Sequence, residues 1–177
     1  GNNIINESSD TITIGASGDT TNIVGTLQNN GAAVAVANTP AFSAYANADQ
    51  NNNSDNTWVK LAMNAEFYDT NSKYDVSNYR FTPTVAGKYI FGADVYIDGN
   101  DTRDSVGLAF YKNGSKLFFV ISDVDNTTAN SITATIDLDS DDYVELYGYA
   151  DVANNSVWAM NMDGTTSNNR CYWYGYK

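Results

Sequence analysis

The chain has 177 residues, 42% of them hydrophobic and 13% aromatic, enough for one cored domain with a modest extension or at most two small domains. It carries 21 acidic and 9 basic residues, a formal charge of −12, which argues against nucleic acid or an anionic membrane as a partner because both need a cationic face. There is no histidine and Cys171 is the single cysteine, which excludes histidine-dependent catalysis, histidine metal sites and an intramolecular disulfide.

Residues 1–39 differ in character from the rest, because they contain no aromatic residue, lysine or arginine. Two short segments with β propensity, Thr11–Ile14 and Asn22–Val24, are separated by glycines. Neither segment could bury a core alone. The segment is therefore either a flexible linker or a β-rich stalk intertwined with other chains around one axis. We favour the stalk and expect the second domain to begin at Pro40.

From Pro40 onward aromatic residues are frequent and turn residues recur at short intervals, which predicts an all-β domain. In Gly87–Ile97 apolar residues alternate with others, as in a strand that buries one face. Asn113-Gly114 between apolar segments is typical of a two-residue hairpin turn. Strands are expected near residues 41–45, 57–63, 78–81, 87–97, 105–112, 116–122, 131–138, 142–150, 156–162 and 171–176. This spacing favours a β-sandwich or jelly roll.

The order of the motifs in residues 40–177 resembles the globular head of the first complement component and its tumour-necrosis-factor-like relatives. The shared pattern includes an Ala-Phe-Ser-Ala opening, a Tyr-Asp before a strand ending in Phe, a Pro-x-x-Gly-x-Tyr-x-Phe corner, a Lys-Asn-Gly hairpin and a closing aromatic strand. The matching positions are Phe42, Ser43, Ala44, Tyr74, Asp75, Phe81, Pro83, Gly87, Tyr89, Phe91, Lys112, Asn113, Gly114, Tyr147, Gly148 and Gly175.

The resemblance implies a ten-stranded jelly roll that assembles as a homotrimer around a threefold axis. The terminal segment CYWYGYK supports assembly independently, because a strand that is apolar or amphipathic on both faces must bury the second face against something. Tyrosine suits such an interface, since it buries area and keeps a polar tip. We expect Tyr172, Tyr174, Tyr176 and Tyr147 in the trimer interface.

The glycine-punctuated N-terminal segment followed by such a head is similar to the C-terminal part of structural fibre proteins of tailed bacteriophages. The resemblance implies a non-enzymatic virion structural protein, a trimeric tail- or head-fibre tip or decoration module. It would lie on the virion surface, contact other virion proteins through its N-terminal side and bind a host-surface glycan or protein receptor. A secreted lectin-like adhesion module of the same fold is the alternative, and a polysaccharide hydrolase is the less favoured third.

Catalysis finds little support in the residues. Glu7, Glu66 and Glu145 are the only glutamates, and Glu145 falls in an alternating strand where an exposed face would explain it. Many aspartates could form a carboxylate pair for glycoside hydrolysis, but nothing in the sequence singles out one pair. Cys171 is expected to be a small buried residue and not a reactive thiol. We expect no enzymatic activity and no required cofactor.

Calcium is the candidate ion, because acidic and amide side chains gather in loops between the expected strands. Asp98, Asn100, Asp101 and Asp104 lie in one loop, and oxygen ligands at this spacing suit Ca²⁺. Similar clusters lie at residues 123–126 and 139–142. The alternative is plain turns, in which Asp and Asn are common for conformational reasons.

The three tryptophans are the candidates for stacking on a sugar. Trp173 lies in the terminal strand and is expected in the core or interface. Trp158 follows an Asn-rich turn and is the best candidate of the three for exposure, although burial is the favoured alternative for it too. Trp158 and Tyr149 are the predicted receptor-binding residues.

Overall fold

In the computed structural model of the chain, the described residues are 20, 25, 28–29, 32–33, 40–99, 103–123, 129–161 and 170–177. The chain divides into two compact units, Gly1–Ala37 and Asn38–Lys177. In the first unit β1 (Gln28–Asn29) pairs antiparallel with β2 (Ala32–Ala33). The predicted strands Thr11–Ile14 and Asn22–Val24 lie outside the described residues, and the stalk stays a prediction.

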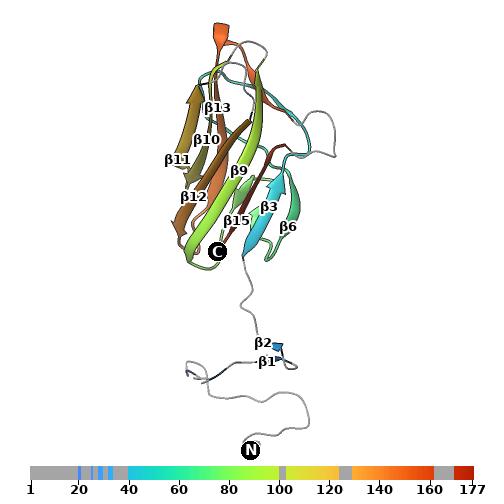
Figure 1. Cartoon of the computed structure of the whole chain (residues 1–177), viewed down its shortest axis with the longest axis vertical. Helices are drawn as coiled ribbons and strands as arrows, with labels where there is room; N and C mark the ends of the chain where they lie inside the picture. Colours follow the sequence, from blue (N-terminus) through green and yellow to red (C-terminus); the bar gives the residue numbers. More distant parts are fainter. Residues whose placement is uncertain are drawn as a thin grey trace, which may run out of the picture. The chain divides into compact units, whose positions relative to one another are not determined.

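The second unit is a sandwich of two antiparallel sheets (Figure 1). The first sheet has six strands in the order β11-β10-β13-β8-β7, with β5 added beside β13. The bounds of these strands are β5 Val59–Lys60, β7 Tyr74–Asp75, β8 Arg80–Phe81, β10 Arg103–Lys112, β11 Ser115–Asp123 and β13 Val144–Val152.

The second sheet has seven strands in the order β4-β14-β9-β15-β3-β6, with β12 beside β9. Their bounds are β3 Ala41–Tyr45, β4 Gln50–Asn53, β6 Ala65–Asp69, β9 Gly87–Gly99, β12 Ala129–Leu138, β14 Trp158–Met160 and β15 Tyr172–Tyr176. The fold is therefore an all-β jelly roll, as predicted. The one helical element among the described residues is a 3-10 turn at Ala153–Asn155, and none of those residues belongs to a helix long and apolar enough to cross a membrane.

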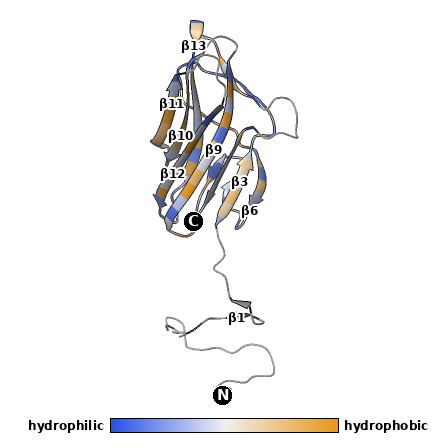
Figure 2. Cartoon of the chain, viewed as in Figure 1, coloured by the Kyte–Doolittle hydropathy of each residue, from blue (hydrophilic) through white to orange (hydrophobic). Residues whose placement is uncertain are grey.

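The core lies between the two sheets and is supplied by inward-facing residues of several strands, among them β9, β10, β13 and β15. Along β9 the buried side chains are Tyr89, Phe91, Ala93, Val95 and Ile97, and Figure 2 shows hydrophobic and hydrophilic residues alternating along this strand. Phe42 stacks on Phe81 with ring centroids 4.7 Å apart and meets Trp173 edge-on at 4.7 Å. The Phe42–Phe81 contact joins the sheets, because Phe81 belongs to the first sheet and Phe42 to the second, while Trp173 lies in the second sheet with Phe42.

The Asn113-Gly114 turn is confirmed, since β10 and β11 pair with Lys112 opposite Ser115. Both turn residues have positive φ, 52° and 76°, as a primed two-residue turn requires. Other expectations were incomplete. Strands β4, β6 and β7 were not predicted, and of the strand expected at residues 57–63 only Val59–Lys60 pairs as a strand.

Candidate binding surfaces

Three of the four predicted interface tyrosines share the outward face of the second sheet. Tyr172, Tyr174 and Tyr176 are half-buried and alternate with Trp173 and Gly175, which face the core. Tyr174 and Tyr176 stack with ring centroids 6.5 Å apart. With Tyr45, Phe67 and Ile90 they form what we call the tyrosine face.

A glycine of the neighbouring strand makes the tyrosine face flat. A Cβ on Gly92 would lie 2.4 Å from the Tyr174 ring, so the ring can cover β9 only because Gly92 has no side chain. Ile90 on the same strand is 38% exposed, and Phe67, whose ring lies 4.5 Å from that of Tyr45, is 53% exposed. The result is a broad amphipathic surface, the kind expected at a protein–protein contact.

Tyr147 lies elsewhere. It belongs to β13 in the first sheet, where its ring stacks on Tyr111 at 3.8 Å. Burial, together with the neighbouring Glu145 carboxylate, raises the pKa of Tyr147 to about 12. The structure therefore does not bring the four predicted tyrosines together, because β13 and β15 belong to different sheets.

The edge strand β11 is apolar on both faces. Leu117, Phe118, Phe119 and Ile121 are each between 43% and 56% exposed. Within the described residues β11 pairs with β10 alone, so its other side presents unpaired backbone groups. Large apolar side chains on an unpaired edge are a feature of surfaces that mediate protein–protein contacts.

Trp58 and Tyr149 form an aromatic surface on the outward face of the first sheet. Their ring centroids are 5.1 Å apart, and Phe119 approaches Trp58 edge-on at 6.1 Å. The Lys116 ammonium lies 4.7 Å from the Trp58 ring centre. We call these four residues the aromatic platform.

Backbone and amide groups hold the platform in place. A Cβ on Gly107 would lie 3.1 Å from Cη2 of Trp58, so this glycine lets the indole rest on β10. The Tyr149 hydroxyl donates to Oδ1 of Asn56 at 2.7 Å, and Asn56 N donates to the Ala150 carbonyl at 2.9 Å. Half-exposed rings beside the Asn56 amide and the Lys116 ammonium are suited to stacking on a sugar and bonding its hydroxyls.

Trp158 is not on this surface: it is buried, the alternative favoured for it from the sequence, and is not exposed as a receptor-binding role would need. It is 1% exposed, and its Nε1–H donates to the Ser54 carbonyl at 2.9 Å. Its ring occupies the inner side of the first sheet, where a Cβ on Gly148 would lie 3.1 Å from it. Trp173, expected in the core or interface, is in the core at 0% exposure. Trp58, one of the three candidates but not the one singled out from the sequence, is the tryptophan that lies on the outward surface.

Glu145 was expected on an exposed face and is instead buried. Its side chain is 8% exposed and pairs with Lys60 at 3.0 Å. A buried carboxylate needs such a partner. Cys171 is buried as expected, and burial raises the pKa of its thiol to about 11, which leaves it in the unreactive neutral form.

The predicted calcium ligands lie only partly within the described residues. Asp98 lies near the end of β9, where Asn161 Nδ2 donates a hydrogen bond to its Oδ2 at 3.4 Å. Asp104 lies on β10, and its side chain is exposed. Asn100 and Asp101 lie outside the described residues, so the calcium site stays a prediction. In the part of the chain that is described, no three acidic or cysteine side chains gather as metal ligands would.

The third acidic cluster has a conformational explanation. Asp142 pairs with Lys112 at 2.7 Å and accepts a hydrogen bond from Asn113 Nδ2 at 2.6 Å. Its carboxylate therefore ties the connection before β13 to the hairpin turn. This use of an aspartate matches the plain-turn alternative for that loop.

Fold and surfaces together define the class: an all-β jelly roll of the kind found in complement and tumour-necrosis-factor-like proteins. Residues 41–165 match the family model of the C1q domain, and the chain belongs to the C1q domain family. It is similar to the globular domain of zebrafish complement 1qA, with 17% identity, 77% of this chain and 95% of that one covered, and a TM-score of 0.53.

Two further solved structures share the fold. Murine APRIL at pH 8.0 is 12% identical, covers 77% of this chain and 97% of its own, and has a TM-score of 0.54. Eiger TNF from S. frugiperda is 10% identical, covers 77% and 90%, and has a TM-score of 0.51. At these identities the likeness concerns the fold alone.

One relative found by sequence similarity is a protein of a phage-like element. The chain is 30% identical over 100 residues to the phage-like element PBSX protein XkdV of Bacillus subtilis (strain 168). The match covers 51% of this chain and 15% of that protein, so the chain spans a small fraction of the relative's length.

Proposed function

We propose that the chain is a non-enzymatic structural and adhesion module of a phage particle. It assembles as a homotrimeric fibre-tip or decoration module on the virion surface, contacts other virion proteins through its N-terminal side and binds a host-surface glycan or protein receptor. The similarity to a phage-like element protein and the membership in the C1q domain family support this biology.

The observation that carries the proposal is the opposition of two outward surfaces. The tyrosine face lies on the second sheet, and the aromatic platform lies on the first. Because the sheets pack through their inner faces, these surfaces point in opposite directions. One can contact other copies of the chain while the other stays free for a ligand.

Self-assembly through the tyrosine face fits the edge strand as well. Rotation about a threefold axis brings one surface of a chain against a different surface of its neighbour. The tyrosine face is broad, and β11 presents a narrow row of apolar side chains. We propose that the tyrosine face of one chain meets the unpaired edge and Phe118 of β11 in its neighbour, and that Phe119 stays with the aromatic platform, outside this contact.

Light scattering on a size-exclusion column tests the assembly. We expect a mass near three chains of 19.2 kDa each. Tyr174→Ser should shift the mass toward one chain, because it removes a ring from the centre of the tyrosine face. Tyr147→Ser is the matched control on the other sheet and should leave the mass unchanged.

A monomeric mass for the unaltered chain at micromolar concentration would refute the assembly. Dissociation by both variants would instead place Tyr147 in the interface, as predicted from the sequence, and would overturn the assignment to the tyrosine face alone. Repeating the measurement in EDTA tests for calcium. Loss of the trimer in EDTA would indicate that the acidic loops bind a structural ion.

A further inference from the structure

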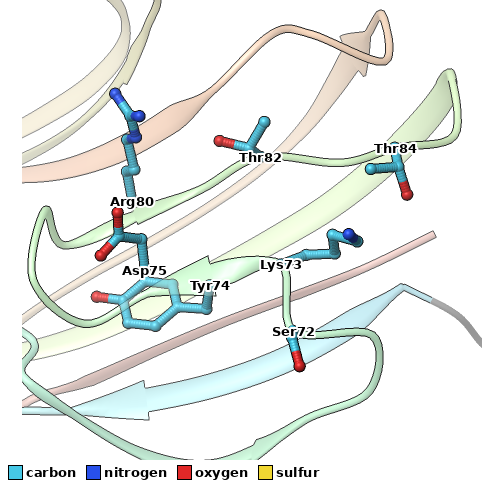
Figure 3. Close-up of a pocket in the computed structure, with 7 residues that line it drawn as sticks. All are labelled: Ser72, Lys73, Tyr74, Asp75, Arg80, Thr82 and Thr84. Carbon is cyan, nitrogen blue, oxygen red and sulfur yellow. The ribbon is translucent and has the colours of Figure 1, made fainter.

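A polar hollow lies apart from the tyrosine face and the aromatic platform, beside β7 and β8. It has a volume of about 220 Å³ and is lined by Ser72, Lys73, Tyr74, Asp75, Arg80, Thr82 and Thr84. Figure 3 shows Arg80, Thr82 and Thr84 following one another along one segment, with Lys73 and Asp75 on the neighbouring one.

Strand alternation explains why polar side chains gather there. Tyr74 pairs with Phe81, and both are buried. Their neighbours must therefore point outward, since successive side chains in a strand face opposite ways. Asp75 lies opposite Arg80, and Thr82 N donates to the Lys73 carbonyl at 2.9 Å. Lys73, Arg80 and Thr82 are thus fixed on one face by backbone pairing, and Thr84 lines the hollow from the segment that follows β8.

Among the described residues, neither cation of the hollow forms an ion pair with a carboxylate. Ion pairs in the described residues join Lys60, Lys88 and Lys112 to acids, but none includes Lys73 or Arg80. The Arg80 Nε–H is buried and has no hydrogen-bond partner. A buried donor left unpaired is costly, and a bound water or ion is one of the ways in which native structures satisfy such a group.

The carboxylates flanking Arg80 are engaged elsewhere. Asp75 Oδ1 accepts hydrogen bonds from the backbone N–H groups of Ser77 and Asn78, at 2.8 and 3.0 Å. Hydrogen bonds from Asn78 and Ser77 are the main cause of the lowered pKa of Asp75, and the nearby charge of Arg80 adds a smaller effect. On the other side Glu145 pairs with Lys60 at 3.0 Å. Arg80 itself lies over the Tyr143 ring, 5.0 Å from its centre, which orients the guanidinium.

The hollow therefore offers more donors than acceptors. Lysine and arginine carry donors only, while the serine and threonine hydroxyls can donate or accept. Its charged lining, Lys73 and Arg80 against Asp75, is net positive in a chain whose formal charge is −12. A ligand that fits must bring acceptors and negative charge, and the hydroxyls suit a sugar that carries them.

We propose that this hollow binds an acidic sugar, through a carboxylate or phosphate group held between Lys73 and Arg80 and ring hydroxyls held by Thr82 and Thr84. The inference rests on the proposed function only for the origin of the ligand at a host surface. The site is separate from the aromatic platform, and one chain supplies all of its lining.

Calorimetric titration of the full chain tests the site with three small probes: methyl glucuronide, glycerol 3-phosphate and the neutral methyl glucoside. We expect at least one acidic probe to bind, the glucoside not to bind, and the affinity to fall with added salt. Lys73→Gln and Arg80→Gln should each weaken binding about ten-fold or more, since each removes a charge-assisted hydrogen bond.

Lys88→Gln is the control, because Lys88 is an exposed lysine paired with Asp137 on the other sheet. Binding of the glucuronide alone identifies a carboxylate ligand, and binding of the glycerol phosphate alone identifies a phosphate ligand. Absence of binding by both acidic probes, or equal weakening by Lys73→Gln and Lys88→Gln, would overturn the proposal. Neither binding result depends on the mass of the trimer or on Trp58. Failure of the acidic-sugar site and failure of the proposed function can therefore be told apart.

Discussion

Trp58 and Trp158 should respond to alanine substitution in opposite ways, because one lies on the surface and the other fills the core. Trp158 is 1% exposed and donates a hydrogen bond to the Ser54 carbonyl. Its removal leaves a cavity against Gly148, and truncating a buried tryptophan costs about 3–5 kcal/mol of unfolding free energy. Trp58→Ala loses two aromatic contacts at a half-exposed site, which should cost about 1 kcal/mol.

Urea unfolding followed by circular dichroism measures the difference. With a slope of roughly 2 kcal/mol per molar urea, a loss of about 4 kcal/mol lowers the midpoint by about 2 M, and a loss of about 1 kcal/mol by about 0.5 M. Both variants must be compared at one chain concentration, because assembly makes apparent stability depend on concentration.

Binding to an array of immobilised host polysaccharides gives the second readout. Trp58→Ala should lose binding while remaining folded and trimeric. Trp158→Phe, a milder change for the case in which the alanine variant does not fold, should bind as the unaltered chain does. A small midpoint shift for Trp158→Ala would refute its place in the core, and undiminished binding by Trp58→Ala would refute the platform as receptor site.

Two further substitutions test the packing and the acid stability. Gly175→Ala places a Cβ 2.5 Å from the Phe91 ring, and this overpacking should cost about 1–3 kcal/mol; an unchanged melting temperature would contradict it. The Lys112 hydrogen bond lowers the pKa of Asp142 from 3.8 to about 2, so its stabilisation is complete above pH 4 and is lost as pH falls through about 2. Asp142→Asn should therefore lose less stability between pH 5 and 2 than the unaltered chain, and parallel profiles in acid titration would exclude this linkage.

Local pattern predicted the parts of the fold that local chemistry determines. The alternation along Gly87–Ile97 predicted the buried face of β9, and Asn113-Gly114 predicted the β10–β11 hairpin. Strand β4 was not predicted because its residues, Gln50–Asn53, are all polar. It forms through pairing with β14, a partner more than a hundred residues away in the sequence. Tertiary pairing overrides weak propensity there.

The sites were harder to predict than the strands. Alternation along a strand predicts which residues share a face, but it does not predict which sheet the strand joins. Tyr147 and Tyr174 look alike in sequence and lie on opposite sides of the sandwich. The preceding Asn-rich turn made Trp158 the best candidate of the three tryptophans for exposure, although burial was favoured, and Gly148 on another strand is what makes room for its ring in the core. The aromatic platform combines residues from three separate segments, so no local sequence pattern predicts it.

The unpaired edge of β11 makes the monomeric chain prone to aggregation. Its segment KLFFVIS combines β-branched and aromatic residues with a single charge, at Lys116, and leaves one side of the backbone unpaired. Such an edge can recruit further strands without limit and grow into an aggregate. The threefold contact that we propose would end that growth after three copies, so the speed with which newly made chains find each other would decide the yield of usable protein.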